Sequence, residues 1–90
     1  MAYRIEIERR AGKELTRLAQ QDQTRILAAI EALTENLRPT GCRPVQAAPK
    51  GTYRIRVGEY RVIYVVLDQG QVVVIARVAR RGESTYRGLG

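Results

Sequence analysis

The sequence predicts a single α+β domain over residues 1–90, in which a helical hairpin packs on one face of a mainly antiparallel sheet. Two observations support this fold class. The apolar residues alternate with a period of two at the N-terminus, change to helical spacing from about Arg10, and return to strand-like runs after residue 51. The chain has 90 residues and contains neither Trp nor Phe, so its core must be built from Leu, Ile, Val and Ala with five Tyr.

The first element is a strand at residues 3–8, YRIEIE, where apolar and charged side chains alternate. Its apolar face holds Tyr3, Ile5 and Ile7. A short amphipathic helix is expected from about Arg10, because Ala11, Leu15 and Leu18 recur at i, i+4 and i+7.

A second, longer helix follows the polar segment QQDQ, which offers Asp22 as an N-cap. Pro39 and Gly41 are expected to end it. Two helices joined by a few residues predict an αα-hairpin. The apolar face of this second helix comprises Ile26, Leu27, Ile30, Leu33 and Leu37.

An irregular connector is predicted at residues 39–51, PTGCRPVQAAPKG, because it holds all three prolines. Within it, Val45 marks either a short strand or a buried anchor. The Gly58-Glu59 pair suits a two-residue II′ hairpin turn, and Asp68-Gln69-Gly70 forms a second turn. These turns predict a three-stranded antiparallel meander built from Thr52–Val57, Tyr60–Leu67 and Gln71–Val78.

The hairpin carries arginines inside an apolar run, YRIRVGEYRVIY. With Gly58-Glu59 as the loop, Arg56 lies directly opposite Arg61, and Arg54 shares their face of the sheet. Like charges in opposite positions destabilise a sheet by about 0.2–1 kcal/mol, so the placement favours an anion between them. Phosphate fits, because the guanidinium fork binds it bidentately. The alternative is a solvated face on which Arg stems cover apolar sheet.

The net charge of +7 is carried mainly by arginine, which accounts for 14 of the 16 basic residues. Arginine matches phosphate geometry better than lysine does, and the charge is typical of a nucleic-acid binder. A basic protein kept in solution by its charge is the alternative interpretation. More arginines follow at the end of the last strand, which is expected to lie near Arg61, and a tyrosine comes a few residues later. Arginines gathered beside an aromatic side chain are typical of RNA binding. The residues are the arginines Arg77, Arg80, Arg81 and Arg87 and the tyrosine Tyr86.

Several functional classes are excluded by composition. A single cysteine, Cys42, and the absence of histidine exclude an internal disulfide, imidazole-based zinc sites and histidine acid–base catalysis. We therefore expect neither a metal nor another cofactor. The chain contains no apolar stretch of roughly 18 residues, and MAYRIEIE lacks the apolar region of a signal peptide. These features predict a cytoplasmic protein without a membrane partner.

Across nearly its whole length, the sequence resembles the RelE/ParE superfamily of bacterial toxins, and the RelE branch in particular. The resemblance rests on the YRIEIE strand, the two helices, YRIRVGEYRVIY, the VVVIARVARR strand end and the terminal STYR. It implies a RelE-like fold and the toxin of a type II toxin–antitoxin system, neutralised by a RelB-like antitoxin. It also implies entry into the ribosomal A site and cleavage of the mRNA bound there.

Carried over by motif, the resemblance assigns catalytic roles to Arg54, Arg56, Arg61, Arg81 and Tyr86, with Arg80 as the alternative to Arg81. Further RNA contacts are expected from Lys50, Arg77, Arg80 and Arg87. RelE carries lysines at the first two of these positions, and arginine is a poor general base. Tyr86 is then the best candidate for proton transfer, because clustered arginines lower a tyrosine pKa.

Two alternatives remain open on the same fold. One is a ParE-like inhibitor of DNA gyrase, which does not need a phosphate-cleaving arginine cluster. The other is an attenuated, non-catalytic relative that mainly binds its antitoxin.

Overall fold

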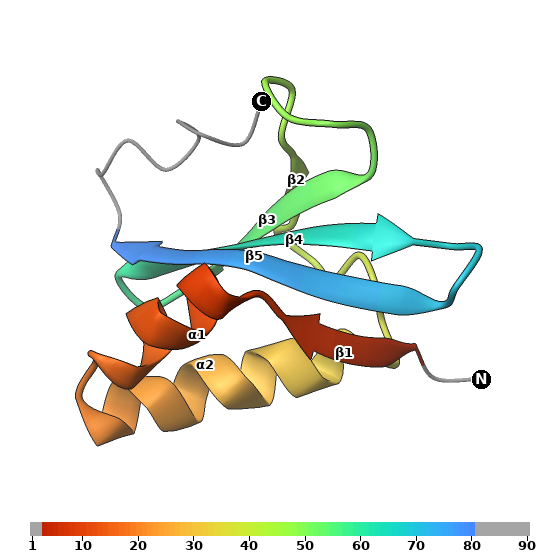
Figure 1. The fold of residues 1–90 in the computed structure, drawn as a ribbon. Coiled ribbons are helices and arrows are strands. Elements are labelled where there is room, and N and C mark those ends of the chain that lie inside the picture. The colour runs from red at the N-terminus through yellow and green to blue at the C-terminus, as the bar shows by residue number, and fades with distance from the viewer. Residues whose placement is uncertain (1–2, 81–90) are drawn as a thin grey trace.

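The computed structural model describes residues 3–80 and shows two helices lying on one face of a five-stranded sheet (Figure 1). The strand order is β1-β5-β4-β3-β2; β1 runs parallel to β5, and all other neighbours are antiparallel. The expected α+β class, helical hairpin and antiparallel meander are confirmed. The elements are β1 (Arg4–Ile7), α1 (Arg9–Thr16), α2 (Gln20–Ala32), β2 (Arg43–Pro44), β3 (Thr52–Val57), β4 (Tyr60–Leu67) and β5 (Val72–Arg80).

The main core lies between the two helices and the sheet. Tyr64 at its centre is fully buried, and its hydroxyl donates a 2.7 Å hydrogen bond to the carbonyl of Leu37. This bond satisfies the one polar atom that the aromatic ring brings into the core. The buried residues of this core are Ala11, Leu15, Ile26, Ile30, Leu33, Ile55, Val62, Tyr64, Val66, Val73, Ile75 and Val78.

A smaller cluster occupies the opposite face of the sheet, where Ile63 and Ala76 pack against Val45 from the connector. Val45 is 7% exposed, and its backbone N–H donates to the carbonyl of Thr52 at 2.9 Å. It therefore serves as the expected buried anchor, and the two-residue strand β2 lies directly before it.

The boundaries of α2 differ from the sequence-based expectation. Asp22 is not the N-cap: Ala19 takes that position without a side-chain cap, and Asp22 lies in the first turn, where a carboxylate interacts favourably with the helix dipole. The helix also ends at Ala32 rather than near Leu37. The N–H groups of the next two residues bond three residues back, so the chain tightens into turns before the prolines are reached.

The first strand is less buried at its end than predicted. Tyr3 and Ile5 pack against the core, whereas Ile7 is 40% exposed. In the described part of the chain, β1 is an edge strand that pairs with β5 alone, and the chain leaves the sheet for α1 directly after Ile7.

A bulge in β5 changes which of its side chains face the helices. Ile63 pairs with Arg77 and Tyr64 pairs with Ile75, so Ala76 has no partner in the β4–β5 ladder. Ile75 and Val78 consequently both reach the helix-side core, which regular alternation would forbid. The same shift places Arg77 on the face that Ile63 occupies. Within residues 3–80, no helix is long and apolar enough to span a membrane.

Candidate nucleic-acid interface

The β3–β4 hairpin has the register that the sequence predicts. Val57 pairs with Tyr60 and Arg56 pairs with Arg61, with no irregularity between the two strands. Gly58, the first loop residue, has φ +60°. Glu59, the second loop residue, has no positive φ, since Gln71 is the only non-glycine residue with positive φ within residues 3–80. This combination fits a II′ turn with glycine in its first central position. The regular turn places Arg54, Arg56 and Arg61 on the same face.

Arg56 and Arg61 face each other, and no carboxylate of the described residues forms an ion pair with either of them. The ion pairs found within residues 3–80 are Arg4–Glu6 and Arg77–Glu14, and neither includes a hairpin arginine. The Nε of Arg61 is buried and has no hydrogen-bond acceptor in the described part of the chain. Leaving a buried donor unsatisfied costs about 1–3 kcal/mol, so an acceptor supplied by a ligand would relieve this position.

A second like-charge pair continues the same surface. Arg43 in β2 lies directly opposite Arg54 in β3, so both side chains share one face with Arg56 and Arg61. We call these four residues the arginine face. Arg43 was not among the expected site residues, because its strand is only two residues long and a two-residue strand has no readable alternation.

A groove of about 480 Å³ borders the arginine face between α2 and β3. The lining includes Arg43, Arg54 and Arg56 together with the small side chains Ala29 and Ala32 of α2, and no described Asp or Glu. The groove is therefore positively charged along one wall and apolar along the other.

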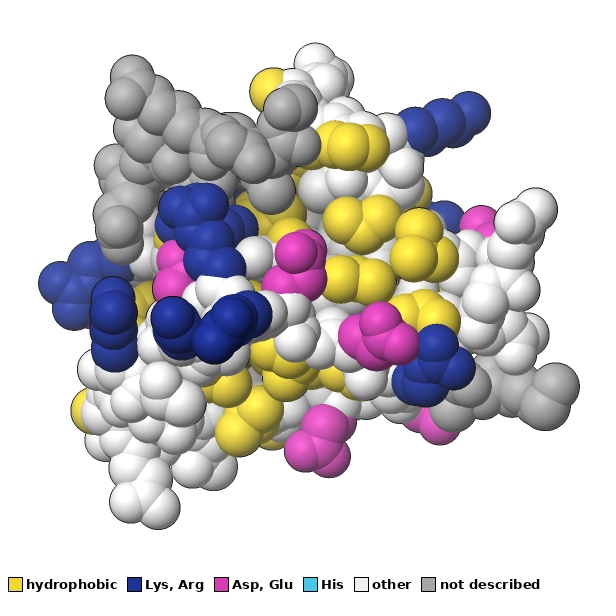
Figure 2. All heavy atoms as spheres, viewed as in Figure 1, with side chains coloured by type: hydrophobic (Ala, Val, Ile, Leu, Met, Phe, Trp, Pro, Cys, Tyr) yellow, Lys and Arg dark blue, Asp and Glu magenta, His cyan; other side chains and the backbone are white. Residues whose placement is uncertain are grey.

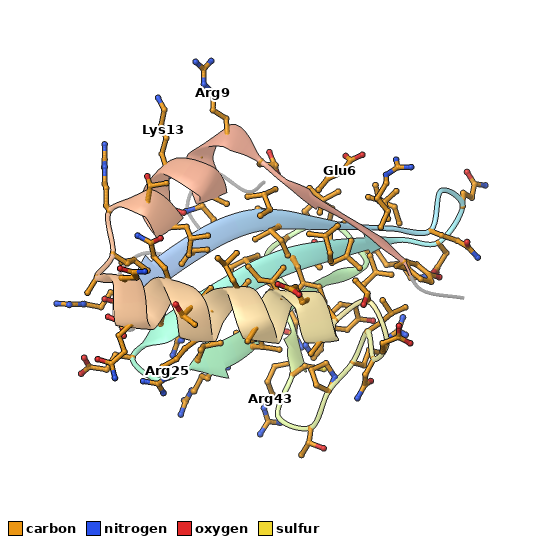
Figure 3. All side chains as sticks on the ribbon, turned by 90° about the horizontal axis from the view of Figure 1, so that it is seen from below. Glu6, Arg9, Lys13, Arg25 and Arg43 are labelled. Carbon is orange, nitrogen blue, oxygen red and sulfur yellow. The ribbon has the colours of Figure 1, made fainter. Side chains whose placement is uncertain are left out.

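Arg25 extends this positive region to the hairpin tip and was also missed. Its guanidinium nitrogens lie 3.3 and 3.5 Å from the point where a Cβ on Gly58 would stand. Figure 3 shows Arg25 and Arg43 projecting from the same side of the molecule. The available signal was the helical spacing of Arg25, Ala29 and Ala32, which places a cation on the same α2 face as two small residues.

Comparisons with known proteins agree with this geometry. Residues 5–85 match the family model described as "ParE toxin of type II toxin-antitoxin system, parDE". A protein of Methanocaldococcus jannaschii described as toxin RelE1 is 32% identical over 97% of this chain and 98% of its own length. The chain belongs to the RelE/ParE superfamily of toxins.

Solved structures show the same fold for this toxin. The archaeal RelE–RelB complex of Pyrococcus horikoshii contains a chain with a TM-score of 0.80 and 29% identity, covering 93% of this toxin and 100% of that chain. The isolated RelE toxin of E. coli has a TM-score of 0.78, with 92% of this toxin and 88% of that chain covered. Its identity of 24% supports similarity of the fold alone.

Arg77 of this toxin does not occupy the exposed position expected for an RNA contact. It is 6% exposed, and its guanidinium binds Glu14 of α1 through Nε at 2.9 Å and through a terminal nitrogen at 2.8 Å. The expected RNA contact of Arg77 stays a prediction, and the sequence reasoning behind it did not anticipate the acidic partner that α1 brings to β5.

Arg80 and Lys50 lie apart from the arginine face. Arg80 pairs with Tyr60, and its guanidinium carbon is 5.9 Å from the centre of that ring, on the face opposite to Arg61. Lys50 is exposed in the turn before β3, at the end of that strand farthest from the hairpin tip. The structure thus brings together Arg54, Arg56 and Arg61, but not these two residues.

The expected site residues Arg81, Tyr86 and Arg87 lie outside the described residues and stay predictions. Strand alternation places the hairpin tyrosines Tyr53, Tyr60 and Tyr64 on the helix face. None of these three can therefore exchange a proton with a phosphate ester bound on the arginine face. Chemically, the described part of this face can bind an anion and stabilise developing negative charge.

Proposed function

We propose that this toxin is a ribosome-dependent mRNA endonuclease, which inhibits translation by cutting the message bound in the ribosomal A site. The observation that carries the proposal is the pairing of Arg56 with Arg61: within residues 3–80, neither arginine forms an ion pair and the Arg61 Nε lacks an acceptor. A phosphate of the RNA backbone supplies the missing acceptor and offsets the repulsion between the two cations. The similarity to a protein described as toxin RelE1 supports this choice within the superfamily.

The reaction proposed is attack of an RNA 2′-oxygen on the adjacent phosphorus. The 2′-hydroxyl gives up its proton, a 2′,3′-cyclic phosphate forms, and the 5′-oxygen leaves after accepting a proton. Arg54, Arg56 and Arg61 hold the phosphate and stabilise the additional negative charge of the pentacoordinate transition state. Arg81 is proposed to join them, because Arg80, the alternative at the strand end, lies over Tyr60 on the opposite face of the sheet.

Because the arginine face contains only arginines, few residues of this chain are left to transfer protons in the reaction. Arginine stays protonated in proteins, so the arginine face stabilises charge but does not act as a general base. Tyr86 is the residue of this chain proposed to accept the 2′-proton, and groups of the ribosome are proposed to assist. Impaired proton transfer at this step is the basis of the attenuated alternative, in which the toxin binds RNA and antitoxin but cleaves weakly.

The proposed protein partner is a RelB-like antitoxin encoded beside the toxin, acting in the cytoplasm. The Pyrococcus horikoshii relative was solved as a RelE–RelB complex. The net charge of +7 favours an antitoxin segment rich in Asp and Glu that covers the arginine face. Binding of that segment would neutralise the surface that the message needs.

A ParE-like inhibitor of DNA gyrase is the second candidate function. Its supporting observation is the match of residues 5–85 to the ParE toxin family. A DNA supercoiling assay separates the two candidates: inhibition of gyrase with unimpaired translation supports the second and excludes the first.

The direct test is cell-free translation with added toxin, followed by mapping of mRNA 3′ ends. Wild-type toxin is expected to produce new 3′ ends within translated codons, and Arg61→Gln to lower the cleavage rate about 10²–10³-fold, as loss of one charge-stabilising donor does. Arg4→Gln is the matched control, because Arg4 lies on β1 and contacts Glu6 at the surface. Full-length, uncut message in the presence of wild-type toxin would exclude the nuclease.

A further inference from the structure

A row of cations runs along the exposed side of α1. Arg9, Lys13 and Arg17 follow one another at intervals of four residues, and all three are exposed. Eight residues of helix span about 12 Å, so the row is an extended line of charge. Figure 2 shows Lys and Arg side chains gathered over α1, and Figure 3 shows Arg9 and Lys13 pointing away from the sheet. We call Arg9, Lys13 and Arg17 the α1 row.

No carboxylate of the described residues neutralises the α1 row. The ion pairs within residues 3–80 are Arg4–Glu6 and Arg77–Glu14, so none involves it. Glu14 is the acidic residue of α1, and it is turned inward, where it accepts from Arg77 Nε at 2.9 Å and from the Val78 backbone N–H at 2.8 Å. The cations of the α1 row therefore stay exposed, while the acidic residue of α1, Glu14, binds residues of β5 instead.

Folding alone does not account for this arrangement. Arg9 and the neighbouring Arg10 stand in the first turn of α1, next to the positive end of the helix dipole, and that turn contains no acidic residue. Like charges four residues apart also repel each other along the helix. Lys13 stands in the last turn, where the dipole favours a cation, so the unfavourable terms are the position of Arg9 and the repulsion within the row. Both terms are offset when an anionic partner lies along the helix.

We propose that the α1 row binds the phosphate backbone of structured RNA and so forms a second RNA contact, separate from the arginine face. Regularly spaced phosphates match a line of cations better than a single anion does. A peptide partner that folds on binding needs apolar anchors. The large apolar side chains exposed within residues 3–80 are Ile7, Leu27 and Leu67; none belongs to α1, and the Ile7 side chain alone lies beside Gly12 of that helix.

The two basic surfaces lie on different sides of the molecule. In Figure 3, Arg9 and Lys13 project on the side opposite to Arg25 and Arg43. One RNA strand can therefore occupy the arginine face while the α1 row contacts a folded RNA around it. This inference rests on the proposed function only in taking RNA as the ligand, and its test measures binding without reading cleavage.

The test compares two triple variants with wild-type toxin. Arg9→Gln/Lys13→Gln/Arg17→Gln removes the charge, and Arg9→Lys/Lys13→Arg/Arg17→Lys keeps it. The probe is a fluorescein-labelled double-stranded RNA, titrated by anisotropy at several KCl concentrations. The neutral variant is expected to reduce the slope of log K against log[KCl] by about 2–3, since each phosphate contact contributes about 0.7–0.9. The charge-keeping variant is expected to retain the wild-type slope, and the melting temperature of neither variant should fall.

Three outcomes would overturn the inference. The first is an unchanged salt slope in the neutral variant. The second is a larger loss of affinity for a labelled glutamate-rich peptide than for the RNA, which would assign the row to an acidic protein partner. The third is an equal loss for both probes, which would indicate unspecific charge attraction. If the toxin bound this RNA through the row but cut no message on the ribosome, the proposed function would fail and this inference would stand.

Discussion

Arg77 and Arg61 lie on neighbouring strands and, by register, on the same face of the sheet, yet their surroundings differ completely. Arg77 is buried and holds a carboxylate of Glu14 at 2.8 Å, in an ion pair whose two side chains are 7% and 20% exposed. Arg61 faces Arg56, and its buried Nε has no acceptor within the described residues. The comparison separates an arginine that stabilises the fold from one that is available to a ligand.

The difference arises from what lies on each side of the two strands. β1 pairs with the first half of β5, and α1 continues along the same edge, so Glu14 reaches Arg77 and the Val78 N–H. Arg61 lies in β4, between β3 and β5, and its direct neighbours are Arg56 and Ala79. Within residues 3–80, no ion pair involves Arg61. A buried ion pair therefore forms on one strand, whereas the neighbouring strand carries the like-charge pair of Arg56 and Arg61.

The largest effect is expected from Glu14→Gln, which breaks the ion pair between Glu14 and Arg77. This change removes the carboxylate that pairs with the buried Arg77, and breaking a buried ion pair typically costs about 3–5 kcal/mol of folding free energy. Urea denaturation followed by circular dichroism measures the loss. Glu31→Gln is the control, because Glu31 is exposed and forms no ion pair within residues 3–80. Equal midpoints for the two variants would show that the Glu14–Arg77 pair does not support the fold.

A smaller effect is expected from Tyr64→Phe, which tests a buried polar group that is neutral. Removing the hydroxyl leaves the Leu37 carbonyl without its donor and is expected to cost about 1–3 kcal/mol. Burial raises the pKa of Tyr64 above its usual value, and the nearby Cys42 raises it further.

This raised pKa also predicts a pH dependence. The unfolded chain loses the Tyr64 proton near pH 10 while the folded chain keeps it, so stability is retained below pH 10 and falls as the pH rises above that value. The slope from this one group is at most about 1.4 kcal/mol per pH unit. Urea midpoints measured from pH 8 to 11 should fall less steeply for Tyr64→Phe than for wild type. Parallel curves would contradict the assignment.

The smallest effect is expected from separating the like-charge pair of Arg56 and Arg61, and it is a gain in stability rather than a loss. Arg56→Thr removes the repulsion with Arg61 and is expected to raise stability by about 0.2–1 kcal/mol, while translation inhibition falls. Arg4→Thr serves as the control, because it removes an arginine from a strand without removing a like-charge pair. A loss of stability in Arg56→Thr comparable to that in Arg4→Thr would show that the hairpin arginines support the sheet.

Local sequence rules were sufficient for the hairpin. Alternation across Thr52–Val57 and Tyr60–Leu67, with Gly58 at the turn, fixed the register and therefore the pairing of Arg56 with Arg61. The period-two strand at the N-terminus and the two helices followed from the same rules, although the end of α2 did not. Its apolar spacing continues to Leu37, but that side chain packs on the core from a bend beyond the helix, and its carbonyl accepts a hydrogen bond from the Tyr64 hydroxyl.

The sequence by itself determined the α+β architecture, the hairpin register and the shared face of Arg54, Arg56 and Arg61, because each depends on residues close in the chain. Only the tertiary structure decided which arginines are available to a ligand. The bulge at Ala76 lies in a uniformly apolar run that shows no alternation, and Arg43 meets Arg54 only through the two-residue strand β2. Arg77 and Glu14 are 63 residues apart, and a contact at that separation exists only when α1 packs beside β5.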